Sequence, residues 1–283
     1  MKRVLLLFIL IFSSLTLASC RSILNPETVL DDYFIESIDD ITSVNLKASN
    51  LTNNYPELFN QVSLDAIKGN MTVYTTSFDG FLMFSTNQQT YFGSGVIFHE
   101  SESYYYILTN EHVAAKLDNK TSVKYLVYDY LGNEYRAFLY EGSLSKDDDL
   151  AVLFFLKGID ELKVMTFNEA ELDINDQVIA IGQPLGQENT ITFGKIIDFG
   201  PTQVSDRYDV LITRSFDAIK HDARVNSGSS GGMLLDYNLN VIGINFASSQ
   251  NEETFLYALS IPISVVIDYI ERLINNDLSE EGN

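Results

Sequence analysis

A chain of 283 residues with 46% hydrophobic content is long enough to bury a sizeable core, which excludes disorder as the default interpretation. The 39 acidic side chains outnumber the 18 basic ones and give a formal net charge of −21, which would repel a phosphate backbone. Because the sequence also contains no local basic patch, we expect no nucleic-acid partner. The 16 Tyr and 18 Phe residues, beside only 5 Pro, favour an all-β fold.

The N-terminus has the pattern of an export signal. Two basic residues precede an apolar run from Val4 to Phe12, and small and polar residues follow. The run is shorter than the ~20 apolar residues of a membrane-spanning helix, so a permanent transmembrane segment is the weaker alternative. The segment Leu17–Cys20 resembles the lipobox of bacterial lipoproteins, in which the signal is cut before a lipidated Cys. We therefore expect a signal peptide over 1–19 and a lipid anchor at Cys20, which would hold the exported protein on the extracytoplasmic face of the cell membrane. The alternative is a Cys that stands near a cleavage site by chance.

Residues 20–66 are predicted to form an acidic tether between the lipid surface and a folded domain. They carry acidic pairs such as Asp31-Asp32 and Asp39-Asp40 without sustained hydrophobic alternation. The alternative is an N-terminal arm that packs on the folded body. Cys20 is the only cysteine, so no intramolecular disulfide can form and the fold has to be stabilised by packing.

After Lys68 the sequence changes to short apolar or alternating runs separated by Gly, Asn and Asp, a pattern typical of a sandwich or barrel. Twelve runs are predicted as strands, and they divide into six and six around Lys157–Asp176, which indicates two similar β-units with a cleft between them. Beyond Pro262 the apolar residues recur at helical spacing, which predicts a C-terminal helix over 264–275 and then a polar tail over 277–283. The predicted strands are Met71–Ser77, Phe92–Phe98, Tyr104–Thr109, Ser122–Tyr130, Tyr135–Gly142, Leu150–Leu156, Gln177–Ile181, Asn189–Phe199, Val210–Ser215, Met233–Leu235, Val241–Ala247 and Leu256–Ser260.

The strongest local signal for chemistry is the glycine-rich turn Asn226–Gly232, which runs directly into an apolar strand. Glycines on both sides of a serine permit backbone angles that let peptide N–H groups turn inward. Such a turn can build an oxyanion hole from the amides of Gly228 and Ser230, with help from Ser229. The alternative is a flexible Gly/Ser hairpin without a catalytic role.

A nucleophilic Ser230 needs a base within hydrogen-bond reach, because a free hydroxyl is almost fully protonated at neutral pH. The chain has three histidines. His112 stands where a predicted strand ends, and a strand end is a rigid mount for a base. His99 is expected to be a solvated loop residue, and His221 lies only nine positions before Ser230 in the sequence. The alternative for a lone histidine such as His112 is a structural role.

The residue that orients the base must be a shielded carboxylate that accepts the ring N–H opposite the reacting nitrogen. Three aspartates precede the apolar strand that begins at Leu150. Asp149 is adjacent to this strand and is predicted to reach the interior. Asp147 and Asp148 are expected to face water, as charge runs usually do.

Five segments follow one another in the chain: Thr109–Ala114, Asp149–Val152, Ile181–Gly186, Asp222–Gly232 and Val241–Asn245. The first four, in this order, resemble the HtrA/Deg-type trypsin-like serine proteases, and the fifth resembles that family's strand beside the substrate. The resemblance extends from about Ile67 to Tyr269 and places the protease domain at 67–276. It implies a chymotrypsin-type fold of two six-stranded antiparallel β-barrels, at about 67–160 and 172–262, with a C-terminal helix.

The resemblance also implies a triad of His112, Asp149 and Ser230 at the junction of the two barrels. It implies no metal and no organic cofactor. The chain departs from the family at Ser229, where Asn is usual, and at Met233, where Pro or Ala is usual. No PDZ domain is expected after the protease domain, and the oligomeric state is left open.

The primary specificity pocket is expected between Ala223–Ser227 and Ile244–Ser248. No carboxylate stands in either segment, which argues against a preference for Lys or Arg and favours small or medium apolar P1 residues. Arg224 is expected to lie outside this pocket. The predicted substrate-binding residues are Val225, Asn226, Ile244, Asn245 and Phe246.

The sequence therefore predicts a serine endopeptidase that cleaves protein or peptide substrates through an acyl-enzyme. A binding lipoprotein that kept the scaffold and lost turnover is the alternative from another class, since fold does not fix function. An esterase with the same triad is disfavoured, because no Gly-x-Ser-x-Gly elbow stands between a predicted strand and a helix.

Overall fold

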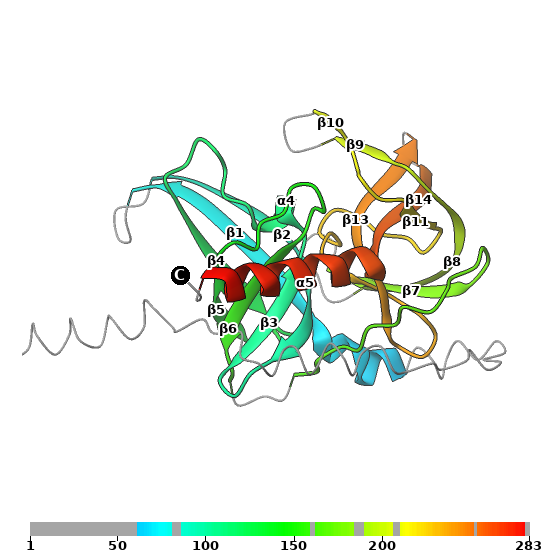
Figure 1. Ribbon diagram of the computed structural model, residues 1–283, viewed down its shortest axis with the longest axis horizontal. Helices are drawn as coiled ribbons and strands as arrows, with labels where there is room; N and C mark the ends of the chain where they lie inside the picture. The colour runs from blue at the N-terminus through cyan, green and yellow to red at the C-terminus, as the bar shows by residue number, and fades with distance from the viewer. Residues whose placement is uncertain are drawn as a thin grey trace, which may run out of the picture. The chain divides into compact units, whose positions relative to one another are not determined.

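The computed structural model describes residues 61–80, 86–158, 162–183, 190–205, 210–251 and 254–280, which lie within one compact unit (Figure 1). The predicted signal peptide over 1–19, the lipidation site Cys20 and the tether up to residue 60 lie outside the described residues. Within the described ranges, no helix combines the length and the apolar character needed to cross a membrane.

The first β-barrel is closed by six antiparallel strands in the order β1-β2-β3-β6-β5-β4 (Figure 1). Its core contains aromatic and aliphatic side chains from facing strands, such as Tyr105 and Phe155, whose ring centroids are 5.6 Å apart. Burial of each large side chain of this kind contributes roughly 1.5–3 kcal/mol. The strands are β1 (Asn70–Asp79), β2 (Thr86–Glu100), β3 (Tyr104–Thr109), β4 (Ser122–Tyr128), β5 (Glu134–Leu139) and β6 (Ala151–Leu156).

The second β-barrel is also closed by six antiparallel strands, in the order β11-β14-β13-β12-β7-β8. Two closed six-stranded barrels with a C-terminal helix confirm the predicted fold class. The strands are β7 (Gln177–Gly182), β8 (Thr190–Gly200), β11 (Ala218–His221), β12 (Met233–Leu235), β13 (Val241–Asn251) and β14 (Thr254–Pro262).

One strand of the second barrel was predicted in the wrong place. The run Val210–Ser215 contains β10 (Leu211–Thr213), which pairs with β9 (Gln203–Ser205) in a separate two-stranded sheet. The barrel position belongs instead to β11, which pairs with β8 and β14. Because β11 has four residues and ends in Lys220 and His221, it lacks the apolar alternation by which a strand is recognised.

The last residues of the predicted tether pack on the folded body, as the alternative of an N-terminal arm proposed. Val62 and Ala66 are fully buried, and Asp65 pairs with Lys163. A short 3-10 helix, η1 (Ala66–Gly69), then leads directly into β1. The described residues from 61 to 66 therefore belong with the folded body.

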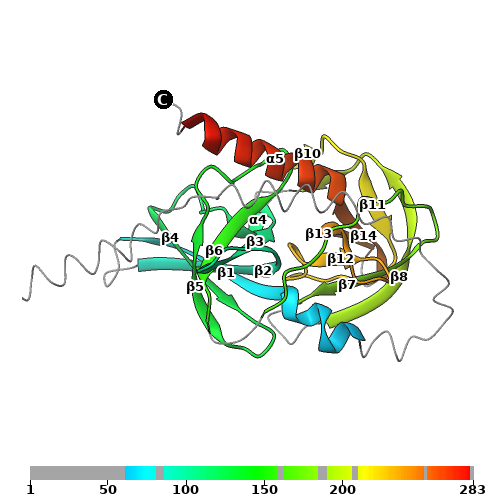
Figure 2. The same cartoon turned by 60° about the horizontal axis from the view of Figure 1, so that its bottom comes forward.

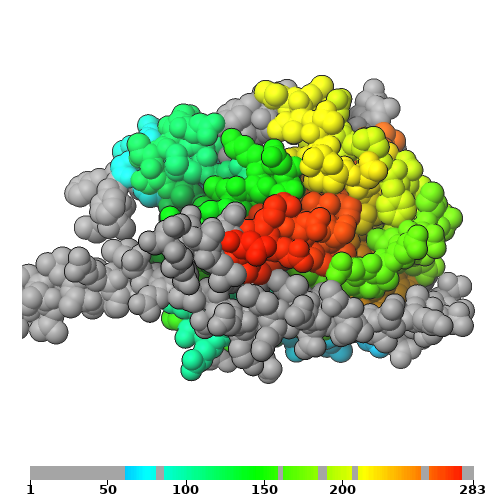
Figure 3. Space-filling model, in the orientation of Figure 1, coloured from blue at the N-terminus to red at the C-terminus, as the bar shows by residue number. Residues whose placement is uncertain are grey.

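The C-terminal helix α5 (Ile263–Glu280) is longer than predicted, since it starts one residue earlier and continues into the predicted polar tail. It follows the last strand of the second barrel and extends toward the first barrel, as both views show (Figures 1 and 2). Its apolar stripe is buried, while its outer side lies at the surface beside segments of both barrels (Figure 3). The buried residues of this stripe are Ile263, Val266, Ile267, Tyr269, Ile270, Leu273 and Ile274.

The helix α5 holds the loop that precedes Asp149. Tyr269 donates its hydroxyl hydrogen to the carbonyl of Ser143, and Arg272 pairs with Asp148 at 2.6 Å. Asp148 was expected to face water, but its residue is 9% exposed and also accepts a hydrogen bond from Ser145. The prediction was wrong because the cation that pairs with Asp148 comes from a distant part of the chain.

Candidate active site

His112 and Asp149 form a direct hydrogen-bonded pair. The Nδ1 atom of His112 lies 3.0 Å from each carboxylate oxygen of Asp149, and the His112 backbone N–H donates to Oδ1 at 3.1 Å. His112 lies on α4 (Glu111–Ala114), a single turn that follows β3 directly. An ionised carboxylate only accepts hydrogen bonds, so the proton of a neutral ring sits on Nδ1 and the lone pair of the ring lies on Nε2.

The carboxylate of Asp149 is 1% exposed. Burial alone would raise the pKa of Asp149, but the charge of His112, the hydrogen bonds from His112 and the charge of Arg214 lower it below its ordinary value. The group is therefore ionised at neutral pH and can stabilise an imidazolium. Arg214, whose Nη2 atom lies 3.0 Å from Oδ2, was not among the predicted site residues.

The backbone of Asp149 has φ of +58°, in the left-handed region that few non-glycine residues adopt. Asn110 supports this conformation, because its Nδ2 donates to the Asp149 carbonyl at 2.9 Å. Asn110 is fully buried, and its own carbonyl also accepts the N–H groups of Val113 and Ala114 at the start of α4. One residue thus connects the helix that carries the base to the turn that carries the acid.

Ser230 lies on the turn that precedes β12 and touches both barrels. Its hydroxyl donates to the carbonyl of Phe246 on β13 at 3.3 Å. Its own carbonyl accepts the N–H of Ser94 on β2 at 2.7 Å. A Cβ on Gly93 would lie 2.7 Å from a methyl carbon of Val113 and 2.8 Å from the Ser230 carbonyl oxygen. The absent side chain of Gly93 therefore lets the serine turn approach α4, the helix of His112.

The glycine turn leaves two amides without a backbone acceptor. Gly228 and Gly231 have φ of +98° and +85°, which only glycine adopts easily. In the described part of the chain, the N–H groups of Gly228 and Ser230 donate to no backbone carbonyl. The N–H of Ser229 instead donates to the carbonyl of Asn226 at 2.9 Å. Ser229 was predicted to help the oxyanion hole, and this bond removes its amide from that role.

Ser94 holds the glycine turn from the first barrel. Its Oγ donates to the Gly228 carbonyl at 2.8 Å and accepts the N–H of Gln183 at 2.9 Å, while its carbonyl accepts from Thr109 at 2.7 Å. Ser94 is fully buried. Sequence reasoning missed this residue; its only local signal is its position between Gly93 and Gly95.

The other two histidines have pKa values lowered by burial. Burial lowers the pKa of His221 to about 4, and its Nε2 lies 3.0 Å from Oγ of Ser260, which donates to Asn245 at 2.8 Å. His99 was expected in a solvated loop, but it lies on β2 beside Tyr106, and burial lowers its pKa to about 4. The prediction for His99 was wrong because β2 continues beyond its apolar run. Among the described residues, no cluster of three His, Cys, Asp or Glu side chains is arranged for a metal ion.

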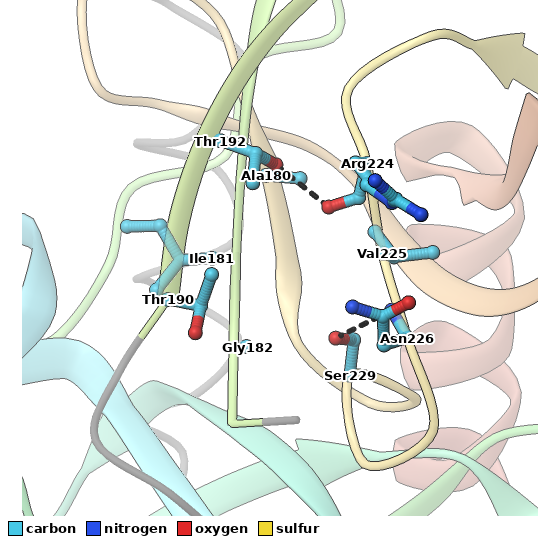
Figure 4. A pocket seen from close by; sticks show the side chains of 9 residues that line it. All are labelled: Ala180, Ile181, Gly182, Thr190, Thr192, Arg224, Val225, Asn226 and Ser229. Carbon is cyan, nitrogen blue, oxygen red and sulfur yellow. Dashed lines mark hydrogen bonds between the residues drawn. The ribbon is translucent and has the colours of Figure 1, made fainter. Parts of the chain in front are cut away.

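A small cavity of about 110 Å³ lies behind the glycine turn, between β7, β8 and the segment 224–229 (Figure 4). It includes the predicted substrate-binding residues Val225 and Asn226, but Ser230 is not among its lining residues. The side chains of Ile244, Asn245 and Phe246 are buried, so any contact they make with a substrate would have to use the backbone of β13. The lining residues are Ala180, Ile181, Gly182, Thr190, Thr192, Arg224, Val225, Asn226 and Ser229.

Known proteins with related sequences and folds are proteases. A family described as the trypsin-like peptidase domain matches residues 93–244 of this chain. The serine protease Do-like HtrA of Lactococcus lactis subsp. cremoris (strain MG1363) is 32% identical over 253 residues, which cover 83% of this chain and 56% of that protein. A probable periplasmic serine endoprotease DegP-like of Chlamydia trachomatis serovar D is 32% identical over 192 residues, which cover 67% of this chain and 35% of that protein.

The fold is similar to a solved structure described as an HtrA-type protease, an AlgW variant, with a decapeptide. The TM-score is 0.60 at 28% sequence identity, and the match covers 77% of this chain and 67% of that chain. The matched regions cover 56% of the Lactococcus relative and 35% of the Chlamydia relative. Both relatives therefore extend well beyond the part that they share with this chain.

Proposed function

Because the chain belongs to the trypsin-like peptidase family, we propose that it is a serine endopeptidase of the HtrA type, with Ser230 as nucleophile, His112 as general base and Asp149 as the orienting acid. The observation that carries this proposal is the buried carboxylate of Asp149, which lies 3.0 Å from Nδ1 of His112. A scaffold without catalysis has no physical need for this pair beside a serine in a glycine turn.

The proposed reaction starts with proton transfer from Ser230 to His112. The Ser230 hydroxyl turns from the Phe246 carbonyl toward Nε2 of His112 and attacks the carbonyl carbon of the scissile peptide bond. Asp149 stabilises the imidazolium that results. His112 then donates this proton to the leaving amine, and an acyl-enzyme remains on Ser230.

The amides of Gly228 and Ser230 are proposed as the oxyanion hole. Both lack a backbone acceptor in the described residues, so they are available to the negative oxygen of the tetrahedral intermediate. Loss of one such donor typically raises the barrier by about 2.7–4 kcal/mol. Water, deprotonated by His112, finally hydrolyses the acyl-enzyme and restores the free serine.

The enzyme is proposed to act outside the cytoplasm on protein or peptide substrates, tethered to the membrane by a lipid on Cys20. The basic and apolar N-terminus supports export, and one relative is named a probable periplasmic endoprotease. The predicted roles of Val225, Asn226, Ile244, Asn245 and Phe246 in substrate binding are part of the same proposal. Labelling with radioactive palmitate, with Cys20→Ser as the unlabelled control, tests the anchor.

A fluorophosphonate probe tests the nucleophile in the full-length protein. The wild type should be labelled and should cleave casein, whereas Ser230→Ala should do neither. Ser103→Ala is the control, because Ser103 is an exposed serine between β2 and β3, outside the proposed site, and should keep both activities. Equal labelling of the wild type and Ser230→Ala would refute the nucleophile, and labelling without casein cleavage would favour an esterase. A wild type that is neither labelled nor cleaves casein would favour the binding lipoprotein.

A further inference from the structure

Arg214 reaches from the end of the two-stranded sheet of β9 and β10 to the acid of the proposed triad. It follows β10, and its backbone N–H donates to the carbonyl of Thr202, just before β9, at 3.1 Å. Its side chain is 7% exposed and crosses to the loop before β6, where Nη2 lies 3.0 Å from Oδ2 of Asp149. Nη1 donates to the carbonyl of Lys146 in the same loop at 2.8 Å.

We propose that Arg214 is a positioning residue that orients the Asp149 carboxylate for His112 and sets the pH range in which the base is active. This inference rests on the proposed triad and goes beyond it. Arg214 touches neither the substrate nor the reacting atoms, and acts through Asp149.

The hydrogen bonds of the carboxylate support an orienting role. Oδ1 of Asp149 accepts the backbone N–H of His112, and the ring Nδ1 is 3.0 Å from both oxygens. Nη2 of Arg214 forms an ion pair with Oδ2 at 3.0 Å. Asp149 is 1% exposed, so without the guanidinium its Oδ2 would lose an ion pair that water could not replace. The carboxylate could then rotate about its Cβ–Cγ bond. Rotation would misalign Nε2 of His112 with Ser230.

The guanidinium is held on its other side by an aromatic ring. Its central carbon lies 5.8 Å from the ring centroid of Phe246, whose carbonyl accepts the Ser230 hydroxyl. Arg214 therefore contacts both the loop of the acid and the residue that holds the nucleophile at rest. Its Nε atom is buried without a hydrogen-bond partner in the described part of the chain. Such a buried, unpaired donor lowers the stability of the fold, so its presence is consistent with a role for Arg214 in the site.

The charge of Arg214 also acts on the base. A fixed positive charge beside Asp149 opposes the formation of a second positive charge on the His112 ring. In the described residues the ion pairs of Asp149 are with His112 from α4 and with Arg214, while the neighbouring Asp148 is paired with Arg272. Removal of the charge should therefore move the acid limb of the activity profile to higher pH.

The test measures the second-order rate of fluorophosphonate labelling of Ser230 in the full-length protein as a function of pH. Arg214→Met removes the charge and keeps the bulk of the side chain. We expect its plateau rate to fall about tenfold to a hundredfold and its acid limb to move up by about one pH unit. Arg214→Lys keeps the charge but loses the planar fork, so its plateau should fall while its acid limb stays in place.

Arg136→Met is the matched control, because it removes an exposed arginine of β5 that lies over the Phe138 ring and has no place in the proposed site. Its plateau and acid limb should stay near those of the wild type. The inference is overturned if Arg214→Met behaves like Arg136→Met, or if Arg214→Met and Arg214→Lys shift the acid limb equally. Circular dichroism checks folding, and if Arg214→Met does not fold, a wild-type plateau for Arg214→Lys overturns the inference.

Failure of this inference can be told apart from failure of the proposed function. If the wild type is labelled and Ser230→Ala is not, the nucleophile stands and only the role of Arg214 is in question. If Ser230 of the wild type is not labelled, the proposed function fails and the role of Arg214 fails with it.

Discussion

The side-chain amide of Asn110 is hydrogen-bonded to the backbone carbonyl of Asp149, with a distance of 2.9 Å from Nδ2 to the oxygen. The two residues lie 39 positions apart, and this bond fixes the unusual backbone angle of Asp149 relative to the helix of His112. The contact predicts a specific result of mutation.

Asn110→Ala should lower both stability and activity. It leaves a buried carbonyl without its donor, which should reduce the free energy of unfolding by about 1–3 kcal/mol, measured by urea denaturation. Casein cleavage should fall as well, because Asp149 loses its fixed position. Asn133→Ala is the control, since Asn133 makes a comparable bond to Asp129 in a hairpin of the first barrel. Asn133→Ala should lower the free energy of unfolding and leave casein cleavage per folded molecule unchanged. An equal loss of cleavage in Asn110→Ala and Asn133→Ala would contradict the prediction.

Ser94→Ala should slow catalysis with little effect on substrate binding. The variant removes the bond that holds the Gly228 carbonyl, so the oxyanion amides lose part of their preorganisation. We expect kcat to fall about tenfold to a hundredfold while KM stays nearly constant, measured with a fluorogenic peptide taken from a casein cleavage site. Ser122→Ala removes a comparable bond at an exposed turn and should keep the wild-type kcat. A rise in KM with unchanged kcat would argue against this role for Ser94.

Gly93→Ala should disrupt the contact between the serine turn and α4. The added methyl would lie 2.8 Å from the Ser230 carbonyl, so one of the two has to move. We expect a loss of about 1–3 kcal/mol in the free energy of unfolding and a large loss of fluorophosphonate labelling. At Gly200 the nearest group to an added methyl is a lysine tip at 3.8 Å, so Gly200→Ala should be tolerated. Normal labelling of Gly93→Ala would show that this close approach is not needed.

Stability should fall as the pH falls below about 6.5. The pKa of His221 and of His99 is lowered from 6.5 to about 4 by burial, so the unfolded chain binds more protons than the folded one between these values. Each histidine then costs up to about 1.4 kcal/mol per pH unit within this window, and its contribution is fully present only above it. Urea denaturation of His221→Gln at a series of pH values should show about half the wild-type slope. An unchanged slope would mean that His221 is not buried in its neutral form.

Much of the fold could be predicted because it is encoded in local patterns. Short apolar runs that alternate with turn residues predicted two β-units, the family resemblance implied that each is a six-stranded barrel, and the helical spacing after Pro262 predicted the C-terminal helix. The prediction failed where the local pattern was weak or misleading. β11 is too short to alternate, and Val210–Ser215 is apolar although it lies in a separate small sheet.

The candidate site was predictable only for residues that carry a motif. The structure brings His112 and Asp149 together, and their catalytic roles stay a prediction until the variants are tested. Ser94, Asn110 and Arg214 were missed because their function depends on contacts between distant parts of the chain. Ser94 is hydrogen-bonded to the Gly228 carbonyl, 134 positions later in the sequence, and no local sequence pattern predicts such a contact.

The hydrogen bond and ion pair from α5 to the loop before Asp149 affect the order in which the chain can fold. Tyr269 and Arg272 lie later in the chain than every strand of the described barrels, yet they anchor the loop in which the acid sits. A growing polypeptide can therefore complete both barrels before this loop makes its bonds to α5. We expect the loop of Asp149 to reach its full set of contacts last, when α5 packs on the two barrels.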